Sequence, residues 1–331
     1  MAIIRPAAAH DLARIEEIYD AIHTAEEAGA ASIGWVRGVY PTRATAQAAL
    51  DAGELFVLES DGTVYAAGYE RQGDRIVAKV WENGTLKYTP GAPGADSYAY
   101  SVFAANGSLY TAGSEESGGA LTAKIWKDGD ALYAYSVSPA VSQARSVCVS
   151  GGDVYAAGSL QSGLTKPLAV VWKNDKAHYT LSDGETPAGV NALCLSGRTL
   201  YAAGHSGGAA AVWKDKELLY TLTDGSSYAE ATAVCRFGHT LYTAGYHTDG
   251  FEEEGVVWKE GQELFDLSDG PGSGSIPYSV AVCYDDIFTA GTIFGTTRTA
   301  VVWHGDEIRY TLSDGTGHSE AYSMYVVPLY D

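Results

Sequence analysis

The sequence predicts a mainly β protein, a six-bladed β-propeller with four-stranded antiparallel blades, preceded by a small α/β segment. Three observations lead to this prediction: an Ala-Gly step recurs at six regularly spaced positions, a Trp follows each of these steps, and successive steps are 41 to 46 residues apart. A repeat of this length is typical of propellers and solenoids. The recurring residues are Gly68, Gly113, Gly158, Gly204, Gly245 and Gly291, followed by Trp81, Trp126, Trp172, Trp213, Trp258 and Trp303.

Each repeat contains four short runs rich in Val, Tyr, Ala, Leu and Trp, which predict four strands, named A, B, C and D in chain order. In the last repeat these runs are residues 278–284, 286–290, 299–303 and 308–312. Turns such as Asn106-Gly107 and Asp128-Gly129 permit the positive φ angles of tight hairpins. Consecutive strands are therefore expected to pair antiparallel, and no helix is expected after residue 60.

The length of the repeat varies almost entirely between strands B and C. From each landmark Trp to the next landmark Gly the distance is 32 or 33 residues, whereas from Gly to Trp it ranges from 9 to 14. Because strand direction alternates, the B–C loops and the D–A connections lie on one face of the propeller, which we call the variable face. Insertions confined to one face commonly mark the binding face of a repeat protein.

Seven segments compete for six inner strands. Residues 55–60 and residues 322–327 are both candidates for strand A of the first blade. Ser323 matches the small residue that the other blades carry at this position, where the N-terminal candidate has Phe56. Bulk forced into a crowded position costs about 1 to 3 kcal/mol. We therefore expect residues 322–327 to close the ring and residues 55–60 to stay with the N-terminal segment.

The first sixty residues have a different pattern. Residues 2–5 and 54–60 predict strands, and residues 10–22 and 42–52 predict helices, so the order is β, α, α, β. We expect two domains, residues 1–60 and residues 61–331. Within residues 1–68 we note Ile4-Arg5-Pro6-Ala7, Asp11-Leu12, Ile18-Tyr19, Tyr40-Pro41-Thr42-Arg43 and Gly53-Glu54-Leu55-Phe56-Val57.

These motifs resemble the N-terminal half of a GNAT-family N-acetyltransferase. The resemblance implies acetyl-CoA-dependent acyl transfer, but the family's Gln/Arg-x-x-Gly-x-Gly/Ala pyrophosphate loop is absent. No acetyl-CoA-binding residue can therefore be assigned. Residues 63–327 resemble bacterial six-bladed propeller repeats of unassigned function, built on a Val-Tyr-Ala-Ala-Gly, Val-Trp-Lys-Asn-Gly, Leu-Thr-Asp-Gly theme. That second resemblance implies shape and no chemistry.

Charge and cysteine usage limit the classes of partner. The chain has 21 Lys and Arg against 41 Asp and Glu, a net charge of −20, which disfavours nucleic acid and anionic membrane surfaces. Neither a signal peptide nor a membrane span is recognisable, so we expect a cytoplasmic monomer. Cys148, Cys194 and Cys235 occupy equivalent strand A positions and are expected, with Cys283, to be free thiols.

The best candidates for ligand contact follow strand B on the variable face. His205, Tyr246 and His247 lie there in adjacent repeats. Further candidates on this face are Tyr69, Arg71, Glu116 and Asp249. No catalytic motif, cofactor or metal site is expected.

Other polar features have simpler explanations. Asp183, Asp224, Asp269 and Asp314 each precede Gly, which is chiefly turn chemistry. Glu252-Glu253-Glu254 could supply a glycosidase-like acid and base, although a solvated loop is the preferred interpretation. Trp35 is expected to pack its loop onto a neighbouring element.

Three hypotheses of function stay open. The leading one is a noncatalytic propeller scaffold that binds a peptide, a glycan or another polar ligand on the variable face. The second is acetyl-CoA-dependent N-acetyltransferase activity of the N-terminal segment, which would need the missing cofactor half. The third is a purely structural module without a ligand.

Overall fold

The structure is a computed structural model of the 331-residue chain, and it forms two compact units, residues 1–64 with 329–331, and residues 65–328. The two units are described separately. The structure describes all residues except 1–2, 7–8, 10–11, 28–36, 38–41, 52–55, 60–64, 83–84, 118, 136–139, 249–251, 268–273, 284–285, 296, 313–318, 320 and 323–331.

The N-terminal unit has the predicted β, α, α, β order. Strand β1 (Ile3–Pro6) pairs antiparallel with β2 (Phe56–Glu59), and the helices between them are α1 (Leu12–Glu27) and α2 (Arg43–Asp51). Helix α1 packs on α2 through Leu12, Ile15 and Ala46, which are buried. The pairing of β2 with β1 confirms that this segment stays with the N-terminal unit.

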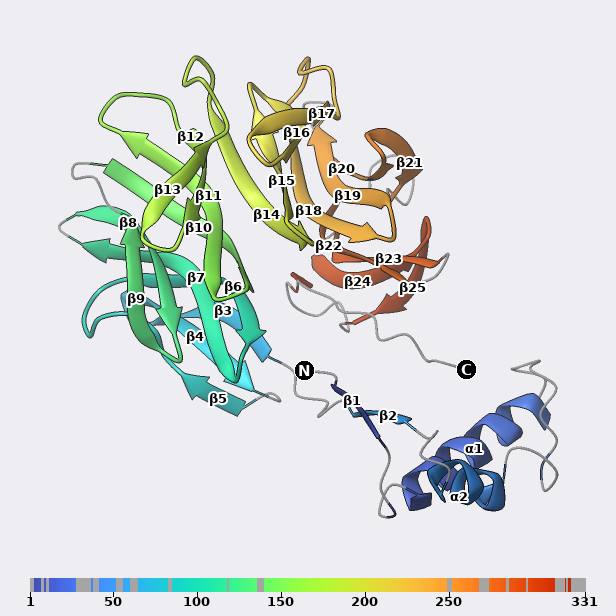
Figure 1. Cartoon of the computed structure of the whole chain (residues 1–331). Coiled ribbons are helices and arrows are strands. Elements are labelled where there is room, and N and C mark those ends of the chain that lie inside the picture. Colours follow the sequence, from blue (N-terminus) through green and yellow to red (C-terminus); the bar gives the residue numbers. More distant parts are fainter. Residues whose placement is uncertain are drawn as a thin grey trace. The chain divides into compact units, whose positions relative to one another are not determined.

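The second unit is a six-bladed β-propeller, as predicted (Figure 1). Blades 2 to 6 each have four antiparallel strands in the order A, B, C, D, and three strands of blade 1 lie within the described residues. Blade 1 consists of β3 (Tyr65–Gln72), β4 (Arg75–Glu82) and β5 (Thr85–Tyr88), which occupy the B, C and D positions. Residues 322–327, expected as its strand A, lie outside the described residues apart from Tyr322.

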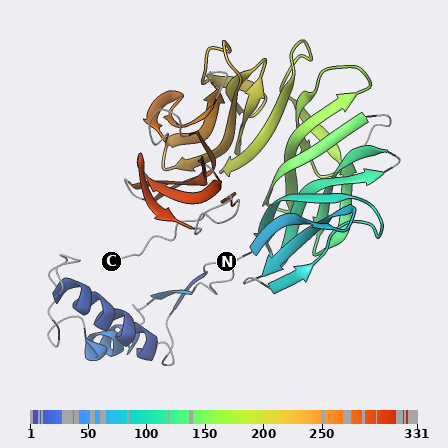
Figure 2. The same cartoon turned by 180° about the vertical axis from the view of Figure 1, so that it is seen from behind.

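The remaining blades follow one another along the chain, and their inner A strands contact one another in sequence, as the reverse view also shows (Figure 2). Blade 2 is β6 (Ser97–Ala105), β7 (Ser108–Ser117), β8 (Ala120–Lys127) and β9 (Asp130–Tyr135). Blade 3 is β10 (Ala140–Ser150), β11 (Asp153–Ser162), β12 (Leu168–Lys173) and β13 (Lys176–Thr180). Blade 4 is β14 (Ala188–Ser196), β15 (Thr199–Ser206), β16 (Ala209–Lys214) and β17 (Glu217–Thr221). Blade 5 is β18 (Ala229–Phe237), β19 (Thr240–Thr248), β20 (Glu253–Lys259) and β21 (Gln262–Asp266). Blade 6 is β22 (Ser275–Cys283), β23 (Asp286–Phe294), β24 (Arg298–His304) and β25 (Glu307–Thr311).

The hydrophobic core lies between adjacent blades. The landmark Trp residues of blades 2 to 6 are at most 3% exposed, and those of blades 3 to 6 pack with small and aliphatic side chains of the preceding blade, such as Ala112, Val171, Val212 and Val257. All four cysteines are free, which confirms the prediction. Burial raises the pKa of Cys148 and of Cys235 to about 12, so both thiols stay protonated at neutral pH.

The landmark Gly has a steric cause. In each A strand of blades 2 to 6 the register shifts by one residue, which is a β-bulge, and the backbone carbonyl just before the bulge lies directly against the landmark Gly of strand B. A Cβ atom at Gly204 would lie 2.0 Å from the Gly189 carbonyl oxygen. Only a residue without a side chain fits there, which explains why the Ala-Gly step recurs.

Candidate functional site

The β-bulges place side chains of four different types at the same backbone position of five blades. A bulge leaves one residue out of the ladder and re-aims its side chain, and bulges are over-represented beside functional sites. The bulge residues lie towards the end of each inner strand that faces the variable face. We call the set the bulge ring; it consists of Tyr100, Arg145, Asn191, Thr232 and Tyr278.

Beside the bulge ring lies the residue that follows each landmark Gly in strand B. These residues pair across the ladder with strand A two positions before the bulge residue; for example, His205 pairs with Gly189 and Tyr246 pairs with Glu230. Their identity also varies among the blades, although two of them are Ser and two are Tyr. They are Tyr69, Ser114, Ser159, His205, Tyr246 and Thr292.

The densest polar contacts centre on Glu230 at the start of β18. The Tyr228 hydroxyl donates to Glu230 Oε1, and Asn191 Nδ2 donates to Oε2 at 3.0 Å. His205 Nδ1 lies 3.5 Å from Oε1, is buried, and makes no hydrogen bond in the described structure. We call Asn191, His205, Tyr228, Glu230 and Tyr246 the Glu230 cluster. It joins two neighbouring blades, because Asn191 and His205 come from blade 4 and Glu230 and Tyr246 from blade 5.

Burial sets the protonation of this cluster. It lowers the pKa of His205 below its usual value; Glu230 opposes this shift and the positive charge of Arg145 adds to it. Burial also raises the pKa of the Tyr228 and Tyr246 phenols, with a further increase from the Glu230 carboxylate. At neutral pH the cluster therefore presents a neutral imidazole and protonated phenols, which can exchange hydrogen bonds with a polar ligand.

A group of tyrosines forms a second part of the variable face. The ring of Tyr69 meets the ring of Tyr98 edge-on at 5.1 Å, and Tyr98 stacks on Tyr100 at 6.1 Å. The guanidinium of Arg145 lies 4.6 Å from the centre of the Tyr100 ring. Three neighbouring blades therefore contribute to one aromatic and cationic surface.

The predicted site residues separate into groups. His205 and Tyr246 both belong to the Glu230 cluster, and His247 lies beside it in β19, with Nδ1 3.5 Å from Glu254 Oε2. Tyr69 is half exposed and belongs to the tyrosine group.

Two other predicted positions lie in different blades from the Glu230 cluster, Arg71 in β3 and Glu116 in β7. Arg71 donates from Nε to the carbonyl of Gly73 in its own hairpin. Glu116 is exposed and contributes, after burial and closer neighbours, to raising the pKa of Tyr98. Asp249 lies outside the described residues.

The simpler explanations hold for several other features. Asp183 accepts from the backbone N–H of Glu185, and Asp224 accepts from Ser226, as expected of turn residues. Asp269, Asp314 and Trp35 lie outside the described residues. Among the described residues no group of His, Cys, Asp or Glu could hold a metal ion.

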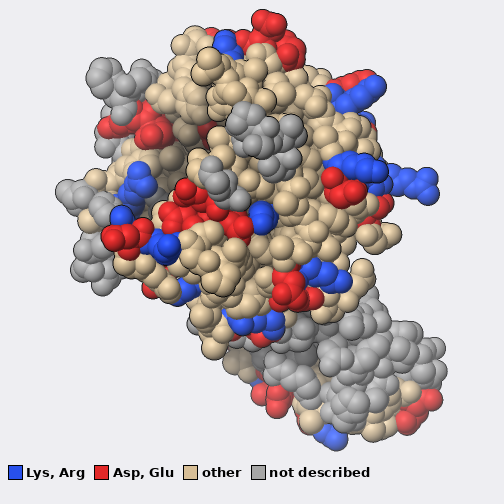
Figure 3. All heavy atoms as spheres, turned by 90° about the vertical axis from the view of Figure 1, so that its left-hand side faces the viewer, with Lys and Arg blue, Asp and Glu red and all other residues tan. Residues whose placement is uncertain are grey.

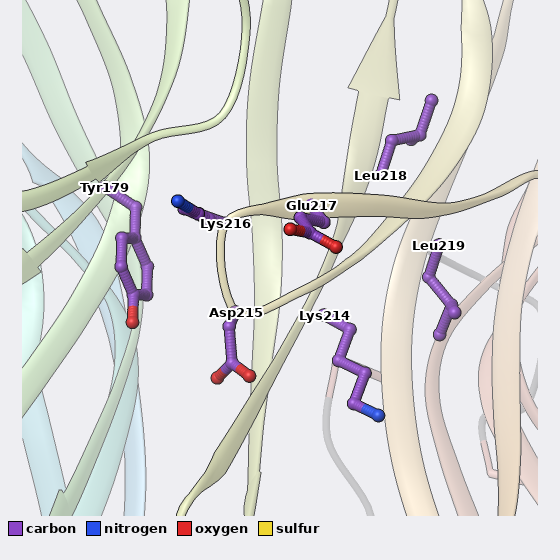
Figure 4. A pocket seen from close by; sticks show the side chains of 7 residues that line it. All are labelled: Tyr179, Lys214, Asp215, Lys216, Glu217, Leu218 and Leu219. Carbon is purple, nitrogen blue, oxygen red and sulfur yellow. The ribbon is translucent and has the colours of Figure 1, made fainter.

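A pocket of about 400 Å³ lies elsewhere, around the turn between strands C and D of blade 4. It contains none of the predicted site residues. The side chain of Lys216 extends to the side of Tyr179 from blade 3, while Lys214 points the other way (Figure 4). C–D turns lie on the face opposite the variable face, which we call the turn face.

Sequence reasoning missed Glu230, Tyr228, Asn191, Arg145 and Tyr100. The signal was present, because each bulge residue directly precedes the small residue that recurs in strand A, such as Ser101, Ser146 and Ala192. A variable residue next to an almost constant one marks the bulge position. Recognising its meaning requires the strand register.

Charged residues of both signs are mixed on the surface shown in Figure 3. In Figure 3, Lys and Arg side chains lie interspersed with Asp and Glu and form no continuous basic area on the face shown. Among the described helices, none has the length and apolar character needed to cross a membrane.

Comparison with known proteins adds information on the fold alone. No family profile matches the sequence, and no curated protein matches it. The structure is similar to the sialidase of Trypanosoma rangeli in complex with sialic acid, with a TM-score of 0.45 and 12% identity. A mutant of that sialidase displaying trans-sialidase activity gives a TM-score of 0.43 and 11% identity.

Each alignment covers 75% of this chain and 53% of the sialidase chain, so the chain spans about half the length of these structures. None of the comparisons supports the resemblance of residues 1–68 to acetyltransferases.

Proposed function

We propose that the propeller is a noncatalytic scaffold that binds a glycan on its variable face, through the bulge ring and the Glu230 cluster. The observation that carries the proposal is the bulge ring itself: five blades place five side chains of four chemical types at one backbone position. A residue needed only for the blade would repeat. Side chains that differ at equivalent positions fit a shaped contact with an asymmetric ligand.

The chemistry favours a glycan over other polar ligands. Tyr69, Tyr98 and Tyr100 offer aromatic rings, and partly exposed phenols combine an apolar face with a hydroxyl. Asn191 Nδ2 lies 3.0 Å from Glu230 Oε2 and His205 Nδ1 lies 3.5 Å from Glu230 Oε1, so an amide, an imidazole and a carboxylate are neighbours. Sugar rings have both an apolar face and several hydroxyl groups, so one ligand can use both surfaces. The proposal requires no cofactor and no second chain.

A glycan array with wild-type protein and matched variants tests the proposal. His205→Ala combined with Tyr246→Phe removes an imidazole and a phenol from the Glu230 cluster, and should lower binding of any glycan found. Lys216→Ala changes the turn-face pocket and should leave binding unchanged. Equal loss in both variants, or binding only of peptides on a parallel peptide array, would contradict the proposal.

Acetyl-CoA-dependent acyl transfer is the alternative that the N-terminal segment suggests. Its support is the β, α, α, β order of β1, α1, α2 and β2 together with the sequence resemblance. Calorimetric titration with acetyl-CoA discriminates the two functions, since saturable binding at micromolar concentration would favour the enzyme. If neither the arrays nor the acetyl-CoA titration detect binding, the purely structural module is favoured.

A further inference from the structure

Arg145 is the basic member of the bulge ring and lies in β10, at the point where the register shifts between Ala144 and Ser146. The bulge takes its side chain out of the alternation that governs the rest of the strand. Arg145 is exposed, so its guanidinium is accessible to a ligand.

The guanidinium is held in position by two neighbours. Nε and Nη2 both donate to Gln143 Oε1, at 3.2 and 2.9 Å, and the guanidinium lies 4.6 Å from the centre of the Tyr100 ring. Stacking on a ring leaves the edge of the planar group free for in-plane hydrogen bonds. The neutral partners hold the group without neutralising its charge.

No ion pair between Arg145 and a carboxylate exists among the described residues, although the chain has 41 acidic residues. The carboxylate of the nearby cluster, Glu230, has both oxygens bonded to Tyr228 and Asn191. The positive charge of Arg145 nevertheless contributes to lowering the pKa of His205 and opposes the increase in the pKa of Tyr228. The cationic group is therefore ordered, accessible and without an anionic partner in the described structure.

We propose that Arg145 binds a carboxylate group on the glycan, so that the ligand is an acidic sugar of the uronate type. This inference rests on the proposed function and specifies its ligand. The carboxylate lies in the plane of the guanidinium, where two parallel N–H···O bonds form. The sugar ring lies against the tyrosine group, and its hydroxyls face the Glu230 cluster.

The test uses galacturonate and glucuronate oligosaccharides, each compared with its methyl ester. Esterification removes the charge and keeps the shape of the sugar. Charge-assisted bidentate bonds predict that wild-type protein binds the free acid about 10-fold to 100-fold more tightly than the ester, as measured by calorimetry. Arg145→Met should abolish this difference, and Arg145→Lys should retain part of it.

The chain offers a matched control in Arg236. Its guanidinium also stacks on a tyrosine, Tyr201 at 5.8 Å, and Nη1 donates to Ser196 at 3.0 Å, but it lies at the turn-face end of β18. Arg236→Met should leave the preference for the free acid unchanged. Circular dichroism melting of each variant separates loss of binding from loss of fold.

The outcomes distinguish this inference from the proposed function. If wild-type protein binds acid and ester equally, or if Arg145→Met keeps the preference, Arg145 is not the carboxylate site, while a glycan-binding function stands. If neutral glycans alone bind, the inference again fails and the proposed function holds. If no glycan binds and a peptide with a free carboxylate does, both the inference and the glycan proposal are wrong.

Discussion

The two faces of the propeller follow different rules. On the turn face the blades repeat the same contacts. The residue that begins the C–D turn has a positive φ in blades 2 to 5. Its side-chain oxygen accepts a hydrogen bond from a backbone N–H near the start of strand B of the same blade. These pairs are Asp128 with Leu109, Asn174 with Val154, Asp215 with Leu200 and Glu260 with Leu241. On the same face Lys127, Lys173 and Lys259 lie over Tyr110, Tyr155 and Tyr242.

On the variable face the backbone repeats and the side chains do not. The bulge occurs in blades 2 to 6, yet its residue is Tyr, Arg, Asn, Thr and Tyr in turn. A contact that recurs from blade to blade is explained by its contribution to the stability of each blade. A position that keeps its backbone geometry and changes its chemistry calls for a cause outside the blade, and a ligand supplies one. The predictions below test this division.

The landmark Trp residues of blades 2 to 6 are buried in the core, so the loss of one should have the largest effect. Trp172 is 3% exposed and stacks on Tyr135 of the preceding blade at 4.7 Å. Trp172→Ala should lower the free energy of unfolding by about 3 to 5 kcal/mol, because the cavity lies in a core that cannot collapse onto it. Urea unfolding measures this loss, and a value below about 1 kcal/mol would contradict a core role.

A smaller loss is expected at the landmark Gly. Gly204→Ala places a Cβ atom 2.0 Å from a backbone oxygen and should cost about 3 kcal/mol, since the bulge must move. Gly68 differs, because the nearest atom to a Cβ there is in the Trp81 side chain, at 3.2 Å. If residues 322–327 supply strand A of blade 1 with the same bulge, as the sequence predicts, Gly68→Ala should cost a similar amount.

Ser319, shortly before that segment, repeats a contact that Ser275 makes in another blade. Ser319 Oγ accepts from the backbone N–H of Ala300 at 3.0 Å, and Ser275 Oγ, at the first residue of β22, accepts from the backbone N–H of Gly255 in the same way. A near-neutral Gly68→Ala variant in thermal melting would show that a different segment, or none, occupies this position.

The repeat length, the landmark residues and the turn residues together predicted the fold, because each has a local cause. Gly is needed where a carbonyl approaches, and Trp fills the space between blades. The site was predicted only in part. His205 and Tyr246 follow directly from the landmark Gly, whereas Glu230 lies in strand A and meets them only through the ladder register and the contact between blades. Arg145 is recognised only from the register shift in β10.

A moderate effect is expected at the repeated turn-face caps. Asp215 Oδ1 accepts the N–H of Leu200 at 3.0 Å, and Asp215 has a φ of 55°. Asp215→Gly keeps that backbone conformation and removes the acceptor, so it should cost about 1 to 2 kcal/mol. Asp215→Asn reproduces the residue that blade 3 has naturally at position 174 and should change stability by less than about 0.5 kcal/mol.

On the variable face, the substitution to compare with the two Asp215 variants is Tyr246→Phe. If the division between the faces is right, removing that hydroxyl should change the free energy of unfolding by no more than about 0.5 kcal/mol while lowering glycan binding. A stability loss as large as that of Asp215→Gly would place Tyr246 among the structural residues. Urea unfolding and the array together decide this.

The smallest expected effect is the pH dependence contributed by His205. Its pKa in the folded protein is lowered, chiefly by burial, whereas in the unfolded chain it takes its ordinary value of about 6.5. Between these two values the unfolded state binds the proton that the folded state does not, so stability rises with pH. The contribution is fully present above about pH 6.5 and is lost as the pH falls through the window below it.

His205→Asn removes the titrating group and keeps a polar side chain. As the pH is lowered from 8 to 5, the free energy of unfolding of the wild type should therefore fall relative to that of the variant. Urea unfolding at each pH measures this difference. Because carboxylates titrate in both proteins, only the difference reports on His205. A difference that is constant with pH would mean that the imidazole is not buried as described, and a difference of opposite sign would mean that Glu230 outweighs burial and holds it charged.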